Sequence, residues 1–127
     1  MEKNKLNLSK EFEWYQEKLK ENRKNIVNEF LNGLVKYNIN LTEIDKLIVR
    51  RENGCFFVNN IISQSVNGVE SELFSITNPS YSKTEMLRDV VQRKVIEEEL
   101  GVTIRYKNER LILGTIEIWT IDCTGIK

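Results

Sequence analysis

Histidine is absent from the 127-residue chain, and with it the side chain that most often acts as a general base or a metal ligand. A Ser-His-Asp triad is therefore impossible, and two cysteines offer too few ligands for a zinc site. The six glycines are scattered, so no glycine-rich phosphate-binding loop exists. The sequence thus lacks the strong motifs of catalysis, and we expect neither a metal nor another cofactor.

Long apolar runs are missing as well, because no stretch approaches the ~18 consecutive apolar residues of a transmembrane helix. The amino-terminal segment has no apolar signal-peptide core. Cys55 and Cys123 lie far apart, and in a chain without an export signal we expect them to stay free thiols. These features predict a cytoplasmic protein with no membrane partner.

Excess charge of either sign is also absent, because nineteen basic residues balance nineteen acidic ones. This balance argues against a strongly basic nucleic-acid-binding protein. Alanine does not occur, whereas asparagine, lysine and isoleucine are abundant, as in AT-rich coding sequences. We therefore expect a bacterial or phage protein that forms one domain over residues 1–127, with residues 1–8 as a tail that need not be ordered.

A long amphipathic helix is predicted over residues 10–37, with Ser9 as its N-cap. Apolar residues recur at steps of three and four and form one stripe: Phe12, Tyr15, Leu19, Ile26, Phe30 and Leu34. Asn22 and Arg23 interrupt this stripe in its middle. The helix either binds a partner or a second copy, or it packs across its own sheet. We favour the second interpretation because most such helices in small domains cover a core.

The start of this helix, "EFEWYQEK", gathers aromatic residues, and Trp14 lies off the apolar stripe. An exposed tryptophan is a plausible anchor for a protein interface. Packing of Trp14 against Leu6 and Leu8 is the alternative. Trp14, Tyr15 and Lys18 are therefore the candidate residues for a protein interface.

A three-stranded antiparallel meander follows, because Asn53-Gly54 and Asn67-Gly68 each stand between β-rich runs. Asn-Gly is the strongest short hairpin signal, since a type I′ turn needs positive φ at both central residues. Two-residue loops predict three cross-strand pairs: Val49 with Val58, Ile62 with Leu73, and Ile61 with Phe74. Both faces of this meander are apolar, so we expect each to be covered at least in part.

A central helix is predicted over residues 82–100, opened by a capping box of Ser82 and Glu85 and closed by Gly101. Its expected inner face contains Met86, Leu87, Val90, Val91, Val95, Ile96 and Leu100. A last hairpin then turns near Asn108-Glu109. The fold class is α+β: an antiparallel sheet of about five strands in the order α-β-β-β-α-β-β, with the long N-terminal helix and the central helix packed on it.

The run Glu97, Glu98 and Glu99 is the densest group of carboxylates. Consecutive residues on a helix point in different directions, so these three do not form a magnesium site. We interpret the run as solvated surface.

Glu117 stands in the middle of the nearly apolar run "RLILGTIEIWTI", which we interpret as an interior strand. The carboxylate either reaches water past the edge of a helix, which we favour, or lies in a pocket with an arginine partner. The candidate partners are Arg50, Arg51 and Arg105. Only one of Arg50 and Arg51 can share a face with Glu117, because neighbours on a strand point to opposite faces.

The segments "VRRENGCFFVNNII" and "NERLILGTIEIW" are similar in hydrophobic rhythm to chorismate lyase and to related ligand-binding domains of some transcription regulators. The resemblance covers about half of the chain and involves no exact motif. It implies that Arg50 or Arg51, together with Glu117, occupies ligand-binding positions.

The absence of catalytic motifs favours a non-catalytic, protein-binding module, such as an inhibitor, an immunity factor or an adaptor. Self-association as a homodimer is compatible with this interpretation. A small-ligand-binding domain or enzyme, with an arginine and Glu117 in its pocket, is the alternative. A third interpretation is nucleic-acid binding through basic residues of the first helix: Lys18, Lys20, Arg23 and Lys24. Glu13, Glu17 and Glu21 weaken it.

Overall fold

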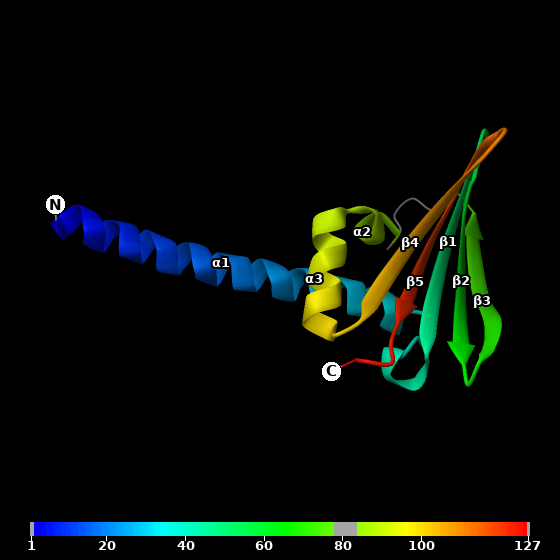
Figure 1. Ribbon diagram of the computed structural model, residues 1–127, viewed down its shortest axis with the longest axis horizontal. Helices are drawn as coiled ribbons and strands as arrows, with labels where there is room; N and C mark the ends of the chain where they lie inside the picture. Colours follow the sequence, from blue (N-terminus) through cyan, green and yellow to red (C-terminus); the bar gives the residue numbers. More distant parts are fainter. Residues whose placement is uncertain (1, 78–83, 127) are drawn as a thin grey trace.

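An antiparallel sheet of five strands, in the order β3-β2-β1-β5-β4, forms the centre of the protein (Figure 1). The computed structural model describes residues 2–77 and 84–126, without the side chains of residues 2–9, 84 and 85. Along the chain the elements are α1 (Glu2–Val35), the 3₁₀ turn η1 (Leu41–Glu43), β1 (Lys46–Gly54), β2 (Val58–Val66), β3 (Val69–Thr77), α2 (Thr84–Arg88), α3 (Val90–Leu100), β4 (Thr103–Leu111) and β5 (Gly114–Asp122). The predicted α+β class and element order are confirmed.

Helix α1 begins at Glu2, well before the predicted start near residue 10. No glycine or proline precedes Gly33, so nothing in the sequence stops the helix from extending in this direction. Ser9 therefore lies inside the helix and is not its N-cap. At the other end the chain leaves the helix through Asn38, whose φ of 59° is left-handed, as is common after a helix.

The two Asn-Gly pairs have different roles. Asn67 and Gly68 both have positive φ, 52° and 80°, and form the predicted turn between β2 and β3. At the first pair the prediction was wrong, because β1 continues through Asn53-Gly54. The N–H of Gly54 donates to the carbonyl of Phe57 at 2.9 Å, so the turn consists of Cys55-Phe56.

Gly54 instead lies opposite Gly114 of β5. The backbones approach so closely here that a Cβ on Gly114 would lie 2.2 Å from the carbonyl oxygen of Asn53. Gly54 thus contributes to a close contact between β1 and β5 and not to a turn.

None of the three predicted cross-strand pairs forms. The observed pairs are Val49 with Ile62, Ile62 with Phe74, and Ile61 with Ser75. The displaced turn shifts the first register, and an irregularity between Ile62 and Ser63 shifts the second by one residue.

The last hairpin turns at Ile112-Leu113 and not at Asn108-Glu109. Asn108 instead pairs with Glu117 inside the sheet, and Leu111 pairs with Gly114. Because β5 must begin at Gly114 to pair with the end of β1, β4 has to extend as far as Leu111. The predicted interior position of β5, between β1 and β4, is correct.

The predicted central helix is divided into α2 and α3 at Asp89, whose backbone is extended. The Asp89 carboxylate accepts hydrogen bonds from the N–H groups of Val91 and Gln92, and so caps α3. The break shifts the helical phase, so Val90 and Val91 are exposed rather than on the inner face. Gly101 is the predicted left-handed C-cap, with φ of 73°. Ser82 and the side chain of Glu85 lie outside the described residues.

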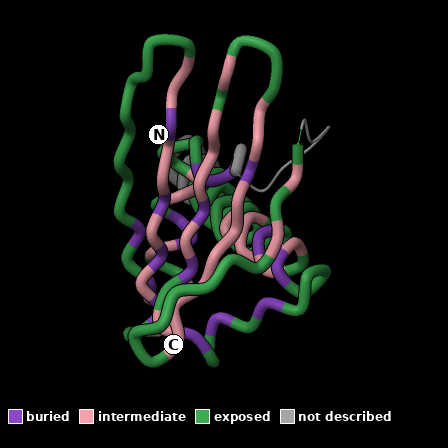
Figure 2. The backbone as a smooth tube through the Cα atoms, turned by 90° about the vertical axis from the view of Figure 1, so that its right-hand side faces the viewer, coloured by how far each residue is buried: buried purple, intermediate pink, exposed green. Residues whose placement is uncertain are grey.

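All three helices lie on one face of the sheet (Figure 1). The core between them is built around six fully buried side chains: Trp119, Phe30, Leu47, Leu87, Ile96 and Ile121. On the other face, seen from the front in Figure 2, no described helix covers the strands. Within the described residues, helices therefore cover one face, and the second face has at most the partial cover of its own long side chains. On this face the register sets Arg50 between Ile61 and Ile118, and such long side chains shield apolar neighbours with their stems.

Candidate functional site

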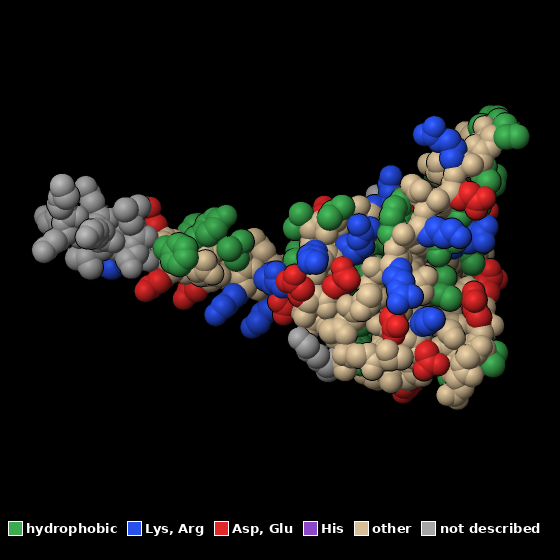
Figure 3. All heavy atoms as spheres, viewed as in Figure 1, with side chains coloured by type: hydrophobic (Ala, Val, Ile, Leu, Met, Phe, Trp, Pro, Cys, Tyr) green, Lys and Arg blue, Asp and Glu red, His purple; other side chains and the backbone are tan. Residues whose placement is uncertain are grey.

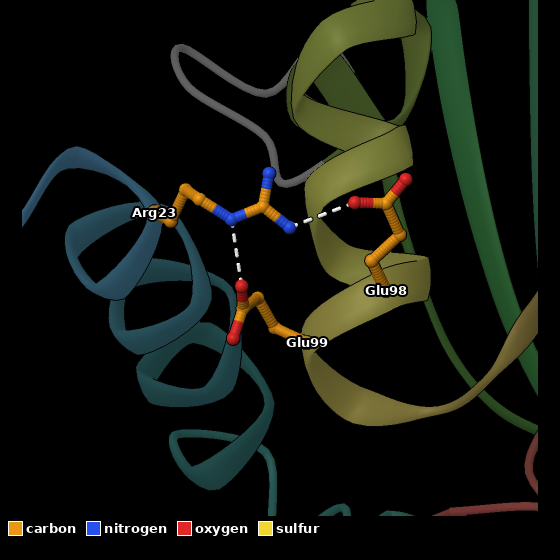
Figure 4. A network of polar contacts seen from close by, with 3 residues as sticks. All are labelled: Arg23, Glu98 and Glu99. Atoms are coloured by element: carbon orange, nitrogen blue, oxygen red, sulfur yellow. Dashed lines mark hydrogen bonds and ion pairs between the residues drawn. The ribbon is translucent and has the colours of Figure 1, made fainter. Parts of the chain in front are cut away.

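The inner half of α1 is part of the core. Phe30 and Leu34 are buried, and Ile26 packs against them from the edge. Just outward of these residues, the Arg23 guanidinium joins α1 to α3 through hydrogen bonds to Glu99 at 2.6 Å and to Glu98 at 2.8 Å (Figure 4). These two bonds hold the pKa of Arg23 above its ordinary value.

The glutamates of α3 therefore do more than solvate its surface. Glu98 and Glu99 bind Arg23, and the Glu97 carboxylate accepts a hydrogen bond from the N–H of Ile104 at the start of β4. The run lies at the surface as predicted, and it also links α3 to α1 and to the sheet.

Outward of Arg23, α1 projects away from the rest of the protein (Figure 1). Every residue from 10 to 22 is exposed. This section nevertheless carries four large apolar side chains, which we call the α1 patch: Phe12, Trp14, Tyr15 and Leu19. Apolar side chains gather on the projecting helix in Figure 3. The favoured interpretation, a helix packed across its own sheet, holds for the inner half of α1 only.

Asn22 and Arg23 mark the division between the two halves. These polar residues occupy positions where the stripe would otherwise continue, so they separate the apolar residues of the exposed half from those of the buried half. The interruption is visible in the sequence, but periodicity alone does not distinguish a weak point within one stripe from a boundary between two.

The three candidate interface residues lie together on the projecting section. Trp14 is 61% exposed, and the Lys18 ammonium lies 5.8 Å from the centroid of its ring. The same ammonium lies 3.5 Å from the Glu21 carboxylate. Aromatic side chains are enriched at the centre of protein interfaces, whereas charged side chains lie mainly at the rim.

Glu117 is held by two partners on the covered face of the sheet. The Tyr106 hydroxyl donates a hydrogen bond of 2.7 Å to one carboxylate oxygen, and Arg88 Nε lies 3.4 Å from the other. The side chain of Glu117 is 15% exposed, so the carboxylate is largely removed from water. Burial, and then the bond to Glu117, raise the pKa of Tyr106, so its phenol stays protonated and donates.

Of the three arginines proposed as partners of Glu117, Arg51 lies beside it, as expected for one of Arg50 and Arg51, and the other two lie on the opposite face. Arg51 pairs with Glu117 in the sheet register and shares its face. Arg50 lies on the opposite face, 3.4 Å from Glu52, and Arg105 is opposite Thr120 on that same face. The ion pair that the structure places on Glu117 comes from Arg88, a residue that sequence reasoning missed. No local signal could identify it, since the pair joins α2 to β5 across a long separation in the chain.

A hollow of about 420 Å³ opens beside Glu117, between α2, α3 and the sheet. Its lining consists of Arg88, Asp89, Val90, Arg93, Tyr106, Glu117 and Trp119. The Arg93 guanidinium lies 5.3 Å from the ring centroid of Tyr106 and donates to the carbonyl of Leu87. Two arginines and two carboxylates balance one another, so the hollow has no strong net charge.

A smaller cavity of about 140 Å³ lies where the end of α1 meets the sheet. Its walls are almost entirely apolar, and include Phe30, Tyr37 and Phe74, with the buried side chain of Asn60 among them. This lining offers no cluster of reactive groups and supports no chemistry.

A second exposed apolar group lies at the end of the sheet farthest from α1. The Cys55 thiol donates to the carbonyl of Leu113 at 3.5 Å, which brings the β1–β2 and β4–β5 turns together. Phe56, Ile112 and Leu113, which we call the hairpin tip, point into solvent, and Ile112 is 100% exposed. Apolar side chains are visible at this end in Figure 3.

Within residues 2–77 and 84–126, no three His, Cys, Asp or Glu side chains are grouped so that they could hold a metal ion. Nor does any helix in these ranges combine the length and apolar character needed to cross a bilayer.

Comparison of the chain with protein-family models, curated proteins and solved structures found no match. The resemblance to chorismate lyase therefore rests on hydrophobic rhythm alone.

Proposed function

We propose that the protein is a non-catalytic binding module that acts through protein contacts made by the α1 patch. One observation carries the proposal: α1 leaves the core at Arg23 and presents four large apolar side chains on a section that is exposed throughout. Exposed apolar groups of this kind mark interaction sites. An inhibitor, an immunity factor or an adaptor would use such a surface.

The spacing of the patch fits the insertion of a helix into an apolar groove of a partner. Phe12, Tyr15 and Leu19 follow one another at three and four residues, as do the anchors of such helices. The section is already helical before binding, so less conformational entropy is lost on association than for a segment that folds on its partner.

Affinity capture from the source cell with matched baits tests the proposal. The patch variant combines Phe12→Gln with Trp14→Gln, and its control combines Val69→Gln with Val91→Gln, two valines of β3 and α3 that are as exposed as the patch residues. We expect wild type and control to retain the same proteins and the patch variant to lose them. Capture that is unchanged in the patch variant would contradict the proposal.

A small-ligand-binding domain is the second candidate, and the hollow beside Glu117 favours it. The observation is specific: Arg88 and Arg93 stand next to a largely buried carboxylate and a phenol in an open hollow. An aromatic carboxylate such as benzoate would stabilise the fold on binding. Thermal unfolding with benzoate checks this, with Arg93→Gln expected to abolish the shift and Arg105→Gln, on the other face, expected to keep it.

Nucleic-acid binding through α1 receives no such support. Arg23 already binds two carboxylates, and Lys18 lies next to Glu21. We therefore advance no role in nucleic-acid binding.

A further inference from the structure

The exposed face of α1 follows a heptad repeat. Phe12 and Leu19 occupy successive a positions and Tyr15 the d position between them, with Asn22 at the next d and Ile26 at the next a. All but Ile26 are exposed, and Ile26 marks the point where the seam enters the body of the protein. Steps of three and four fit an a/d seam between two helices as well as a helix that covers a core, so the exposure of these residues in the structure favours the seam.

We propose that the partner of the α1 patch is a second copy of the same chain, with the two α1 helices antiparallel around a twofold axis between positions 13 and 14. This inference rests on the proposed function and specifies its partner. The interface is isologous, because the same residues of both copies form it.

Self-complementarity of the sequence supports this register. It sets Phe12 opposite Tyr15 of the second copy, and Tyr15 opposite Phe12.

The charges beside the seam distinguish the antiparallel from the parallel arrangement. Glu11 and Lys18 occupy successive g positions, and g residues face g residues in an antiparallel pair. The proposed register brings Glu11 next to Lys18 of the second copy, twice by symmetry. A parallel pair would bring Glu11 next to the uncharged Gln16 of the second copy and would therefore lack this ion pair.

The projecting length of α1 leaves room for this pairing. The helices overlap over positions 2–25, which corresponds to about 36 Å of helix. Arg23 of one copy lies level with position 4 of the other, so the two points of attachment to α3 are about 28 Å apart along the axis. The two bodies therefore lie at opposite ends of the pair.

Sedimentation equilibrium of the full chain tests the proposal with charge-reversal variants. We expect the wild type to be a dimer, and Glu11→Lys or Lys18→Glu alone to raise the dissociation constant roughly tenfold, since each turns two attractive pairs into repulsive ones. The double variant reverses both charges and should return close to wild type. Glu17→Lys and Lys20→Glu make the same charge changes away from the seam and serve as matched controls, with no expected effect.

Three outcomes would overturn the inference. Association unchanged by Glu11→Lys would indicate a parallel pair, because Glu11 would then lie next to the uncharged Gln16 of the second copy. A dimer that survives Phe12→Gln would place the interface elsewhere. A monomeric wild type would exclude a second copy as partner, yet leave the proposed function intact if capture of other proteins still depends on the patch. If neither dimerisation nor capture depends on the patch, both proposals fail.

Discussion

Tyr106 on β4 donates its hydroxyl to Glu117 on β5, although the residue directly opposite Glu117 is Asn108. The bond is diagonal across the two strands, and it places the ring of Tyr106 against Trp119, with centroids 5.4 Å apart. Arg88 closes the arrangement from α2. The carboxylate in the apolar strand is thus held by neighbours of its own chain, as part of the contact between helices and sheet.

Tyr106→Phe removes the hydroxyl and leaves Glu117 without its shortest hydrogen bond. Because the acceptor is a largely buried carboxylate, we expect a loss of about 1–2 kcal/mol in the free energy of unfolding. Urea denaturation measures it. Tyr37→Phe is the matched control, since the Tyr37 ring stacks on Phe74 and should contribute as Phe does. Equal losses in both variants would contradict this role of Tyr106.

The two tryptophans should report separately on α1 and on the core. Trp14 is exposed and Trp119 fully buried. Trp119→Phe therefore leaves a protein whose fluorescence is quenched readily by acrylamide, whereas Trp14→Phe leaves blue-shifted emission that resists quenching. Protection of Trp14 in the Trp119→Phe protein would mean that α1 folds back onto the body. Trp14 occupies a c position outside the proposed seam, so dimerisation alone does not protect it.

Cys55 and Cys123 should differ sharply in reactivity, since Cys55 is exposed and Cys123 buried. A thiol reagent should label one cysteine in the folded protein and both after denaturation. Rapid labelling of Cys123 in a Cys55→Ser variant would show that its side chain is not buried.

Burial also raises the pKa of Cys123 from 9.0 to about 11. Between these values the unfolded chain has released the thiol proton and the folded protein retains it. The contribution to stability is therefore complete below pH 9.0 and is lost as the pH rises toward 11. Urea denaturation over this interval should show a steeper decline for wild type than for Cys123→Ala; identical slopes would contradict the assignment.

The hairpin tip should contribute little to stability, because its side chains contact mainly water. We expect Ile112→Ser with Leu113→Ser to change the free energy of unfolding by no more than about 0.5 kcal/mol. Ile121→Ser, in the fully buried part of the same hairpin, should cost several kcal/mol, on the order of 3. A large loss from the tip variant would show that these residues are covered.

Prediction from sequence succeeded where a single local signal decides the structure. Gly101 as a left-handed cap and Asn67-Gly68 as a hairpin turn depend only on the conformational freedom of those residues. The turn at Ile112-Leu113 gave no such signal, because two apolar residues in an apolar run look like strand. The neighbouring pair Asn108-Glu109 had the composition of a turn and became strand, since pairing of β5 with β1 determines where the hairpin can end.

Contacts between residues far apart in the sequence could not be predicted either. Arg88 reaches Glu117 only because the chain breaks at Asp89 and α2 lies over β5, and neither fact follows from periodicity. The stripe of α1 predicted an amphipathic helix correctly. It could not show that the stripe is buried in the core at Phe30 and exposed to solvent at Phe12, because the apolar residues have similar spacing in both halves of the helix.

No break interrupts α1 between the patch and the core, so the same hydrogen-bonded helix passes through Trp14 and through Phe30. Helix formation is cooperative, and order imposed at one end favours order along the whole length. A partner bound to the outer half should therefore slow hydrogen exchange in the inner half and raise the unfolding temperature of the entire domain. Binding of a partner and folding of the domain are therefore coupled. A substitution in the core near Phe30 should change the affinity of the distant α1 patch for its partner.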